Sequence, residues 1–234
     1  RGRMLRAETY AVDGSEREPL PYTVTEHAYG LREEEPPSNA TTSSRLRIFF
    51  PHALAERSTQ WERGDDPLTQ FSFTDDYDEH GQPRQQTTVA VPRRSARRGD
   101  ADETRLLATH THTEYARPNP PGYLLFDRVA HQRAFELREP GSVQESSPHD
   151  LSRVLSDQAT AARAAHARFR TLLDGWPPGT PLPLPVRLIA HTIHHYDGPA
   201  FEGLAPGIAG MHGALTRTES LVFTDEHLDA AYKL

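Results

Sequence analysis

A short pattern that occurs twice restricts the fold of this chain more than any other feature of its sequence. A Tyr-Asp pair runs into a glycine in Tyr77–Gly81 and again in Tyr196–Gly198. Each copy follows a run in which apolar and polar residues alternate, over 68–74 and over 188–195. Alternation with a period of two is typical of β-strands, and Asp and Gly tolerate the positive φ angles of tight turns. The pattern therefore predicts antiparallel sheet built from hairpins.

The composition limits how large a core this chain can bury. Of its 234 residues only 35% are hydrophobic, 20 are proline, and the mean hydropathy is −0.70. Such a chain suits a sheet with one solvated face, or a piece of a larger assembly whose other parts complete its core. The chain begins at Arg1 and ends at Leu234 without a cap or a tail, and we therefore expect a segment of a longer protein.

Charge and residue types argue against several classes of function. The chain has no cysteine, which excludes disulfides, thiolate metal sites and a cysteine nucleophile. Its net charge is −7 and its basic residues are scattered, apart from a small cluster within 93–98, so we expect no nucleic-acid partner. No run approaches the ~18 apolar residues of a membrane span, so we expect no direct membrane insertion.

No assembled catalytic motif is present in the sequence. A Gly-x-Ser-x-Gly elbow, a phosphate loop and a dinucleotide-binding fingerprint are all missing. We therefore expect a protein that is not an enzyme, with no catalytic residue, no cofactor and no cofactor-binding residue.

Alternating runs predict six to eight strands before residue 140. We expect a strand pair within 4–12 and 22–31, and then strands over 46–50, 53–60, 68–77, 84–91, 105–115 and 123–137. The two stretches that flank the first Tyr-Asp turn form the clearest hairpin. The proline-rich segment 115–122 is not expected to be regular strand, because proline lacks the N–H donor that a ladder needs. The Glu-, Pro- and Ser-rich segment 33–44 is expected to be an exposed loop.

The periodicity changes after residue 140 from two to between three and four. Apolar residues recur at helical spacing from Leu151 to Leu173. Ser147 suits an N-cap with Pro148 at the first helical position, and Gly175 suits a stop. The sequence thus predicts an amphipathic helix over 148–174 whose apolar side packs on the neighbouring sheet.

Beyond a proline-dense connector, 176–185, the pattern returns to strands. We expect strands over 186–196 and 214–223, and a short terminal helix over 224–232 that begins at a Thr cap. The predicted fold class is therefore mainly β, with antiparallel hairpins, one inserted helix and a short C-terminal helix. The expected organisation is a first β segment over 1–140, the helical insertion and connector over 141–185, and a second β segment over 186–234.

The histidines are the candidate metal ligands. His110 and His112 are two apart in a predicted strand and share a face, and His191, His194 and His195 form a second group. The alternative is that the threonines at 109, 111 and 113 take one face while the two histidines take the other, more solvated face. No third ligand or general base is identified, so we favour the alternative and assign no metal site.

The first Tyr-Asp turn also matches half of a calcium loop. Asp76, Asp78, His80 and Gly81 occupy ligand and glycine positions, but the twelfth position is Thr87, where a bidentate Glu is needed. Both flanks predict strands instead of helices. A hairpin turn is the better explanation of these acids.

Two tripeptides match short functional motifs, but neither match is taken as evidence of a function. Arg63–Asp65 is an adhesion-like sequence, but the Asp-Pro that follows it is typical of a turn. Asn39–Thr41 is a formal glycosylation acceptor, which matters only for a chain on a eukaryotic secretory route.

Longer stretches resemble one family. They are Arg6–Arg17, Pro21–Glu26, Trp61–Arg84, His195–Leu204 and Gly213–Glu219. They resemble the middle region of the TcB-type subunit of bacterial insecticidal toxin complexes, and the similarity extends from about residue 1 to the end of the chain. That subunit is similar to Rhs/YD-repeat proteins, so the resemblance implies hairpins that form part of a hollow shell.

The resemblance also implies a role and partners. In that family the shell encloses a cytotoxic polypeptide until a translocation subunit delivers it. The implied partners are a TcC-type subunit, which completes the shell and carries the toxin, and a TcA-type translocation subunit, which is contacted through an upstream propeller. The implied location is a secreted or extracellular bacterial toxin complex that is cytoplasmic before release. No catalytic residue of the family maps onto this chain, so a structural wall segment is expected.

The helix over 148–174 interrupts the strand pattern of such a shell. We expect it to decorate the shell or to plug an opening. With only two Tyr-Asp turns, the repeat pattern is weaker than in a full Rhs region.

Two other functions remain as alternatives. Aromatic residues of the strands could present a surface to carbohydrate or to a receptor, although aromatic side chains in strands more often serve packing. The candidates are Tyr10, Tyr22, Tyr29, Trp61 and Phe71. The second and less favoured alternative is a His-dependent metal hydrolase, which should retain its ion on purification.

Overall fold

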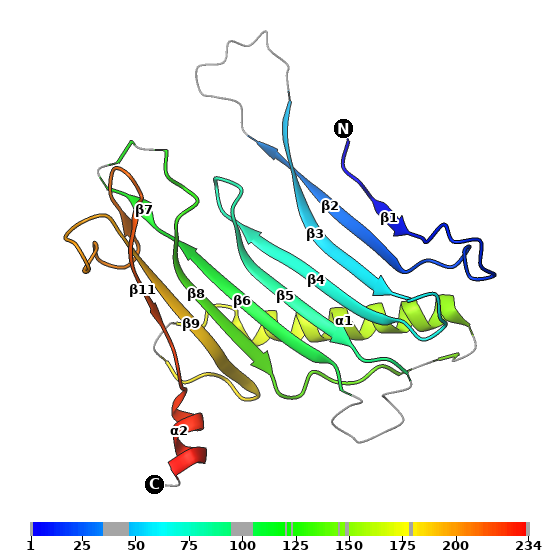
Figure 1. Ribbon diagram of the computed structural model, residues 1–234. Helices are drawn as coiled ribbons and strands as arrows, with labels where there is room; N and C mark the ends of the chain where they lie inside the picture. Colours follow the sequence, from blue (N-terminus) through cyan, green and yellow to red (C-terminus); the bar gives the residue numbers. More distant parts are fainter. Residues whose placement is uncertain are drawn as a thin grey trace.

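The computed structural model describes residues 2–34, 47–94, 105–119, 121–122, 124–144, 146–147, 150–177 and 180–232. Within them the main feature is a nine-stranded sheet in which every pairing is antiparallel (Figure 1). In sheet order its strands are β1 (Arg6–Thr9), β2 (Thr23–Glu34), β3 (Ile48–Gln60), β4 (Leu68–Tyr77), β5 (Pro83–Val91), β6 (Leu107–Tyr115), β8 (Val129–Leu137), β9 (Val186–Tyr196) and β11 (Leu215–Ser220). The expected mainly β, antiparallel fold is confirmed.

The first predicted hairpin is the β4–β5 pair, which closes at the register pair Tyr77 and Pro83. Its turn needs a glycine at Gly81, where φ is +80°. A Cβ on Gly81 would also come within 2.7 Å of the Phe50 ring, so any other residue would displace that ring. The Tyr-Asp pattern thus marks a tight turn here, as expected.

The second Tyr-Asp turn does not close a tight hairpin. β9 ends at Tyr196 and pairs with β11, but residues 197–214 lie between the two strands. Within them β10 (Ile208–Ala209) pairs in parallel with β7 (Arg117–Pro118) in a second, two-stranded sheet. The bend itself is present, with φ of +48° at Asp197 and +77° at Gly198. The bend agrees with the prediction, and so does the long connection, because the expected strands over 186–196 and 214–223 leave 197–213 between them.

Other expected boundaries also differ from the structure. The stretches expected as separate strands over 46–50 and 53–60 form the single strand β3, with Pro51 inside it. Pro51 lies where β3 pairs with β2 alone, so its missing N–H interrupts no second ladder. In the segment 115–122, the short β7 is held through the N–H groups of Arg117 and Asn119, and the intervening proline donates nothing.

The helices lie largely where the periodicity places them. α1 spans Leu151–Leu173, and α2 spans Asp225–Tyr232 with the hydroxyl of Thr224 accepting from the backbone N–H of His227. The N-cap of α1 is Asp150 and not Ser147, because the Asp150 carboxylate accepts the N–H groups at 152 and 153. The predicted position of Pro148 lies outside the described residues. Gly175, with φ of +66°, follows the helix as expected of a C-terminal glycine.

The core lies between α1 and one face of the sheet, which α1 crosses (Figure 1). Small side chains, Ala162 and Ala165, face the sheet from the helix, and Phe169 fills the space beside them. The strands contribute Phe71, Phe73, Val89, Val91, Ala108, Phe135, Leu137 and Val186. Burial of this apolar surface is the main stabilising contribution that the described residues supply.

We predict that Phe169→Ala lowers the free energy of unfolding by about 3–5 kcal/mol, since it deletes a fully buried ring and leaves a cavity. Urea unfolding followed by circular dichroism measures the change. Leu151→Ala, at an exposed position of the same helix, is the matched control and should cost less than about 1 kcal/mol. Equal losses in the two variants would contradict the assignment of the core.

Candidate functional sites at the Tyr-Asp turns and beneath the helix

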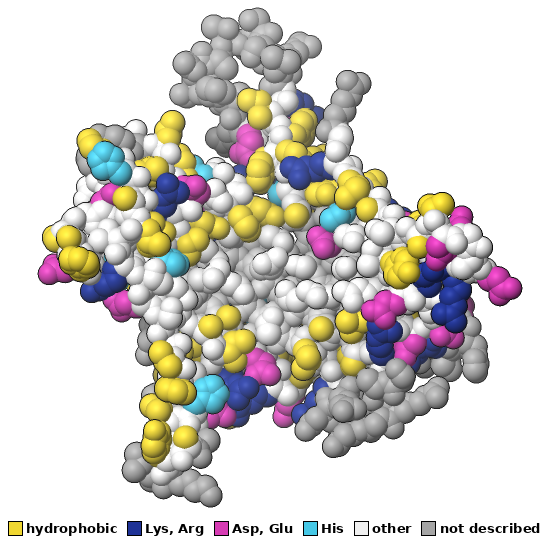
Figure 2. All heavy atoms as spheres, in the orientation of Figure 1, with side chains coloured by type: hydrophobic (Ala, Val, Ile, Leu, Met, Phe, Trp, Pro, Cys, Tyr) yellow, Lys and Arg dark blue, Asp and Glu magenta, His cyan; other side chains and the backbone are white. Residues whose placement is uncertain are grey.

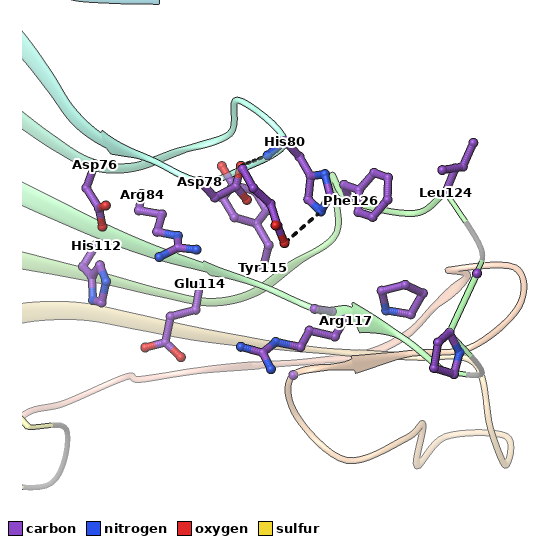
Figure 3. Close-up of a pocket in the computed structure, with 16 residues that line it drawn as sticks. Asp76, Asp78, His80, Arg84, His112, Glu114, Tyr115, Arg117, Leu124 and Phe126 are labelled. Carbon is purple, nitrogen blue, oxygen red and sulfur yellow. Dashed lines mark hydrogen bonds and ion pairs between the residues drawn. The ribbon is translucent and has the colours of Figure 1, made fainter. Parts of the chain in front are cut away.

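A cavity of about 860 Å³ opens beside the first Tyr-Asp turn (Figure 3). Its walls come from the turn, from the end of β6 and from the segment that includes Phe126. Its charged and titratable lining residues are Asp76, Asp78, Glu79, His80, Arg84, His112, Glu114 and Arg117. The cavity therefore mixes acids and bases.

Several polar groups of this cavity make contacts within the protein. The Asp78 carboxylate accepts the backbone N–H groups of His80 at 2.9 Å and Gln82 at 2.8 Å. The His80 ring stacks on Phe126, as Figure 3 shows. The two ring centroids lie 3.5 Å apart. The Glu114 carboxylate pairs with Arg133. These contacts close the turn and hold the adjacent segment against it.

The half calcium loop is not assembled into a cation site. Its twelfth position, Thr87, is fully buried beneath α1 and hydrogen-bonded to His110. Across the described residues no group of three or more His, Asp or Glu side chains is placed to hold a metal ion. The turn explanation for Asp78 agrees with its contacts.

The second Tyr-Asp turn uses its carboxylate differently. Asp197 accepts the backbone N–H of Gly213 at 2.8 Å and that of Ala214 at 3.1 Å, at the far end of the loop. The Asp197 backbone N–H in turn donates to the Ala214 carbonyl at 2.7 Å. Burial works to raise the pKa of Asp197, but the backbone N–H donors outweigh it and the pKa is lowered. Asp197 therefore clamps the base of a long loop, whereas Asp78 closes a short one.

Asp197→Ala should lower the free energy of unfolding by about 1–3 kcal/mol, because it leaves two backbone donors without their acceptor. Asp197→Asn should lose less, since its amide oxygen can still accept. Urea unfolding gives the energies, and amide hydrogen exchange at Gly213 and Ala214 reports whether the loop opens. Asp127→Ala, at an exposed ion pair with Arg128, is the control and should have little effect. Unchanged exchange in Asp197→Ala would contradict the clamp.

A chain of hydrogen bonds crosses the interface between α1 and the sheet. His166 of α1 contacts the Asp75 carboxylate through Nε2 at 2.9 Å and the Thr87 hydroxyl through Nδ1 at 2.9 Å. The same hydroxyl contacts Nδ1 of His110 at 2.9 Å. All three contacts are satisfied when His110 donates to Thr87, Thr87 donates to His166, and His166 donates to Asp75. One helix is thereby tied to three neighbouring strands.

This chain of contacts has the residue types of a nucleophile, base and acid, but not the access that catalysis needs. The Thr87 hydroxyl is 0% exposed, so no substrate can reach it. A hydrogen bond from His166 lowers the pKa of Asp75, against the effect of burial. Burial lowers the pKa of His110 from 6.5 to about 4. The arrangement holds the helix in place.

The structure buries His110 of β6, leaves His112 half-buried, and corrects the expectation about the face that they share. The threonines at 109, 111 and 113 do take the opposite face, as expected. However, His110 is 3% exposed and lies under Phe169, so the histidine face is the covered one and not the more solvated one. Sequence alone does not say which face the helix covers.

The three histidines of β9 do not converge. His191 lies beside His131, with 3.4 Å between the two ring nitrogens. His194 points to the opposite face and contacts the Thr218 hydroxyl at 3.1 Å. His195 is buried and bridges the Leu204 carbonyl and the Glu219 carboxylate, each at 2.9 Å. They serve three separate local contacts.

Two further candidates are engaged elsewhere. The side chain of Arg63, in the adhesion-like tripeptide, is only 10% exposed and pairs with Asp13 at 2.7 Å. Among the aromatic candidates, Phe71 is buried beneath α1, and the Tyr29 hydroxyl donates to the Met4 carbonyl at 3.1 Å.

The glycosylation acceptor at 39–41 lies outside the described residues. No helix in the described part of the chain is long and apolar enough to cross a membrane.

The free energy of unfolding should fall as the pH drops from about 6.5 to about 4, because the unfolded chain protonates His110 in a range where the folded chain does not. The full shift corresponds to a loss of at most about 3 kcal/mol. His110→Phe keeps an aromatic ring but cannot titrate, so its unfolding energy should depend less on pH over this range. Urea unfolding at a series of pH values measures the slopes. His194→Ala, on the opposite face, should keep the wild-type slope, and equal flattening in both variants would contradict the assignment.

The antiparallel sheet and the buried hydrogen bonds that join it to α1 define the chain as a β scaffold. Comparisons with known proteins identify the family to which this scaffold belongs. A family model described as the insecticide toxin TcdB middle/C-terminal region matches residues 1–119. The chain belongs to this family and is a TcB-type segment of an insecticidal toxin-complex protein. No curated protein matched the chain.

Solved structures of toxin complexes share the fold. A TcdB2-TccC3 complex with Cdc42 aligns with a TM-score of 0.64 at 20% identity, covering 98% of this chain and 10% of that chain. TcdB2-TccC3 without its hypervariable C-terminal region gives 0.67 at 20%, with coverages of 98% and 10%. A Photorhabdus luminescens Tc holotoxin pore gives 0.66 at 21%, with the same coverages. The chain thus spans about a tenth of the length of the chains that it matches.

Proposed function

We propose that this chain forms part of the wall of a hollow shell that encloses a cytotoxic polypeptide before its translocation. The observation that carries the proposal is the nine-stranded antiparallel sheet whose outer strands, β1 and β11, each pair on one side only within the described residues. Family membership and the tenfold greater length of the matching chains support a sheet that continues into further strands. The mechanism is physical sequestration of the cargo, with no chemistry performed by this segment.

Exposed apolar side chains near β11 support a missing neighbour. Leu221, Val222 and Phe223 follow this strand, and Val222 is 77% exposed. Leu221 and Phe223 line an apolar groove beside α2, together with Leu182, Leu184 and Leu188. Apolar patches of this kind are typical of interaction surfaces. We propose that other parts of the same shell cover them.

The proposed partners follow from this assignment. A TcC-type subunit completes the shell and carries the enclosed toxin, and a TcA-type subunit translocates it after docking to an upstream propeller. The complex acts outside the bacterium after assembly in the cytoplasm. Within this chain we propose two β segments, over 1–140 and 186–234, and an inserted helical segment over 141–185 that decorates the wall.

Protease protection of the cargo tests the proposed function. In a complex of the full B-type and C-type subunits, the enclosed polypeptide should resist a protease that digests it rapidly after release. Phe169→Ala, which weakens the wall, should increase the digestion rate, whereas Leu151→Ala should not. Rapid digestion of the cargo in the unmodified complex would overturn the proposal.

The isolated chain should self-associate through its open edges. Light scattering should show species larger than a monomer, and Thr218→Lys, which places a charge on β11, should reduce their amount. Thr111→Lys, in the interior strand β6, is the control for added charge and should not. A monomeric isolated chain with a sharp unfolding transition would count against a segment that depends on neighbouring strands.

A further inference from the structure

The two faces of the sheet differ sharply in composition. We call the face turned away from α1 the open face. Its central residues, from β3 to β9, are Ser58, Gln70, Ser72, Thr74, Gln86, Thr88, Ala90, Thr109, Thr111, Gln132, Ala134, Ala190 and Thr192. They alternate along each strand with residues of the core or of the helix-covered face.

None of these central side chains carries a charge. Figure 2 views this face, and its centre is uncharged, with charged side chains gathered towards the margins. The bordering charges include Glu56 and the ion pair between Glu136 and Arg187. Charged residues make up 25% of the chain, so their absence from a contiguous central patch is a property of this face and not of the composition.

The outward side of α1 has the opposite character. Its exposed residues include Arg153, Arg163 and Arg168. A charged fraction of about 25–35% is typical of surfaces that meet bulk water, because it keeps them soluble and free of adhesive patches. The helix side of the sheet fits that description, and the open face does not.

We propose that the open face is the inner surface of the shell and contacts the enclosed polypeptide, while the outward side of α1 meets bulk solvent. This inference rests on the proposed function and adds the orientation of the wall. The occupant is an unfolded polypeptide of no fixed sequence, which the chemistry of the open face suits in three respects.

First, the patch holds neither sign of charge, so it attracts neither an acidic nor a basic cargo. Second, its Thr, Ser and Ala side chains are short, so each contact with the cargo gains little dispersion energy. Third, the backbone groups of β4, β5, β6 and β8 are paired on both sides, so a cargo strand cannot add to the sheet there. The open face can therefore enclose the cargo polypeptide without binding it tightly.

Thiol labelling of the assembled complex tests the orientation. The chain has no cysteine of its own, so Gln132→Cys and Gln70→Cys place single thiols at exposed positions of the open face, and Arg163→Cys places one on α1. The complex of full B-type and C-type subunits, freed of other reactive cysteines, is treated with a maleimide linked to a polymer too large to cross the wall. Arg163→Cys should react more than about tenfold faster than the two open-face variants, and all three should react alike in urea.

The outcomes separate the two proposals. Open-face thiols that react as fast as Arg163→Cys, or faster, in a complex that still protects its cargo from protease would overturn the orientation and leave the shell intact. Digestion of the cargo in the unmodified complex would instead overturn the shell.

A charge test addresses the contact with cargo directly. Gln70→Glu, Thr88→Glu and Gln132→Glu together should slow the release of a basic model cargo at low salt, and added salt should restore the rate. The matched set Gln70→Asn, Thr88→Ser and Gln132→Asn should release it at the wild-type rate. An unchanged release rate in the glutamate variant would contradict a cargo-facing surface.

Discussion

The packing of α1 against one face of the sheet is the interaction on which the rest of this structure depends. It buries the aromatic and aliphatic side chains of β4, β5 and β6, and it places His110 and Thr87 out of reach of solvent. Because side chains alternate along a strand, the residues that α1 does not cover form a second face, and the centre of that face is uncharged. The residues of this largely polar chain are therefore divided between two faces of different composition: an apolar face beneath α1 and an uncharged polar face on the other side of the sheet.

Much of this architecture follows from local sequence, and the failures have physical causes. Alternation located the β4–β5 hairpin, and helical spacing located α1, because both depend on which side chains must share a face. The N-cap was assigned to Ser147 instead of Asp150, since several capping residues stand in a row and only geometry selects one. The partners of Asp197, at 213 and 214, are too distant in sequence for any local rule. Which face of the sheet α1 covers, and hence whether His110 is buried, depends on tertiary packing and not on local sequence.

The two Tyr-Asp turns show that one sequence pattern can stabilise two kinds of connection, a short turn and a long loop. In both, the aspartate carboxylate accepts backbone N–H groups. The neighbouring chain decides whether those donors lie two to four residues away or across a loop. Repeats of this kind can therefore keep a common bend while the connections that follow them vary in length.

The hydrogen-bonded chain beneath α1 limits how that helix can be seated. Its packing residues Ala162, Ala165 and Phe169 are apolar, and contacts among apolar groups are not directional. A slide by one turn, about 5.4 Å, would bring either Ala162 or Arg170 to the position of His166. Neither could link Thr87 to Asp75 as His166 does, so the slide would leave the proton of the buried Thr87 hydroxyl without its acceptor. The hydrogen bonds among His166, Thr87 and Asp75 thus select one alignment of the helix on the sheet.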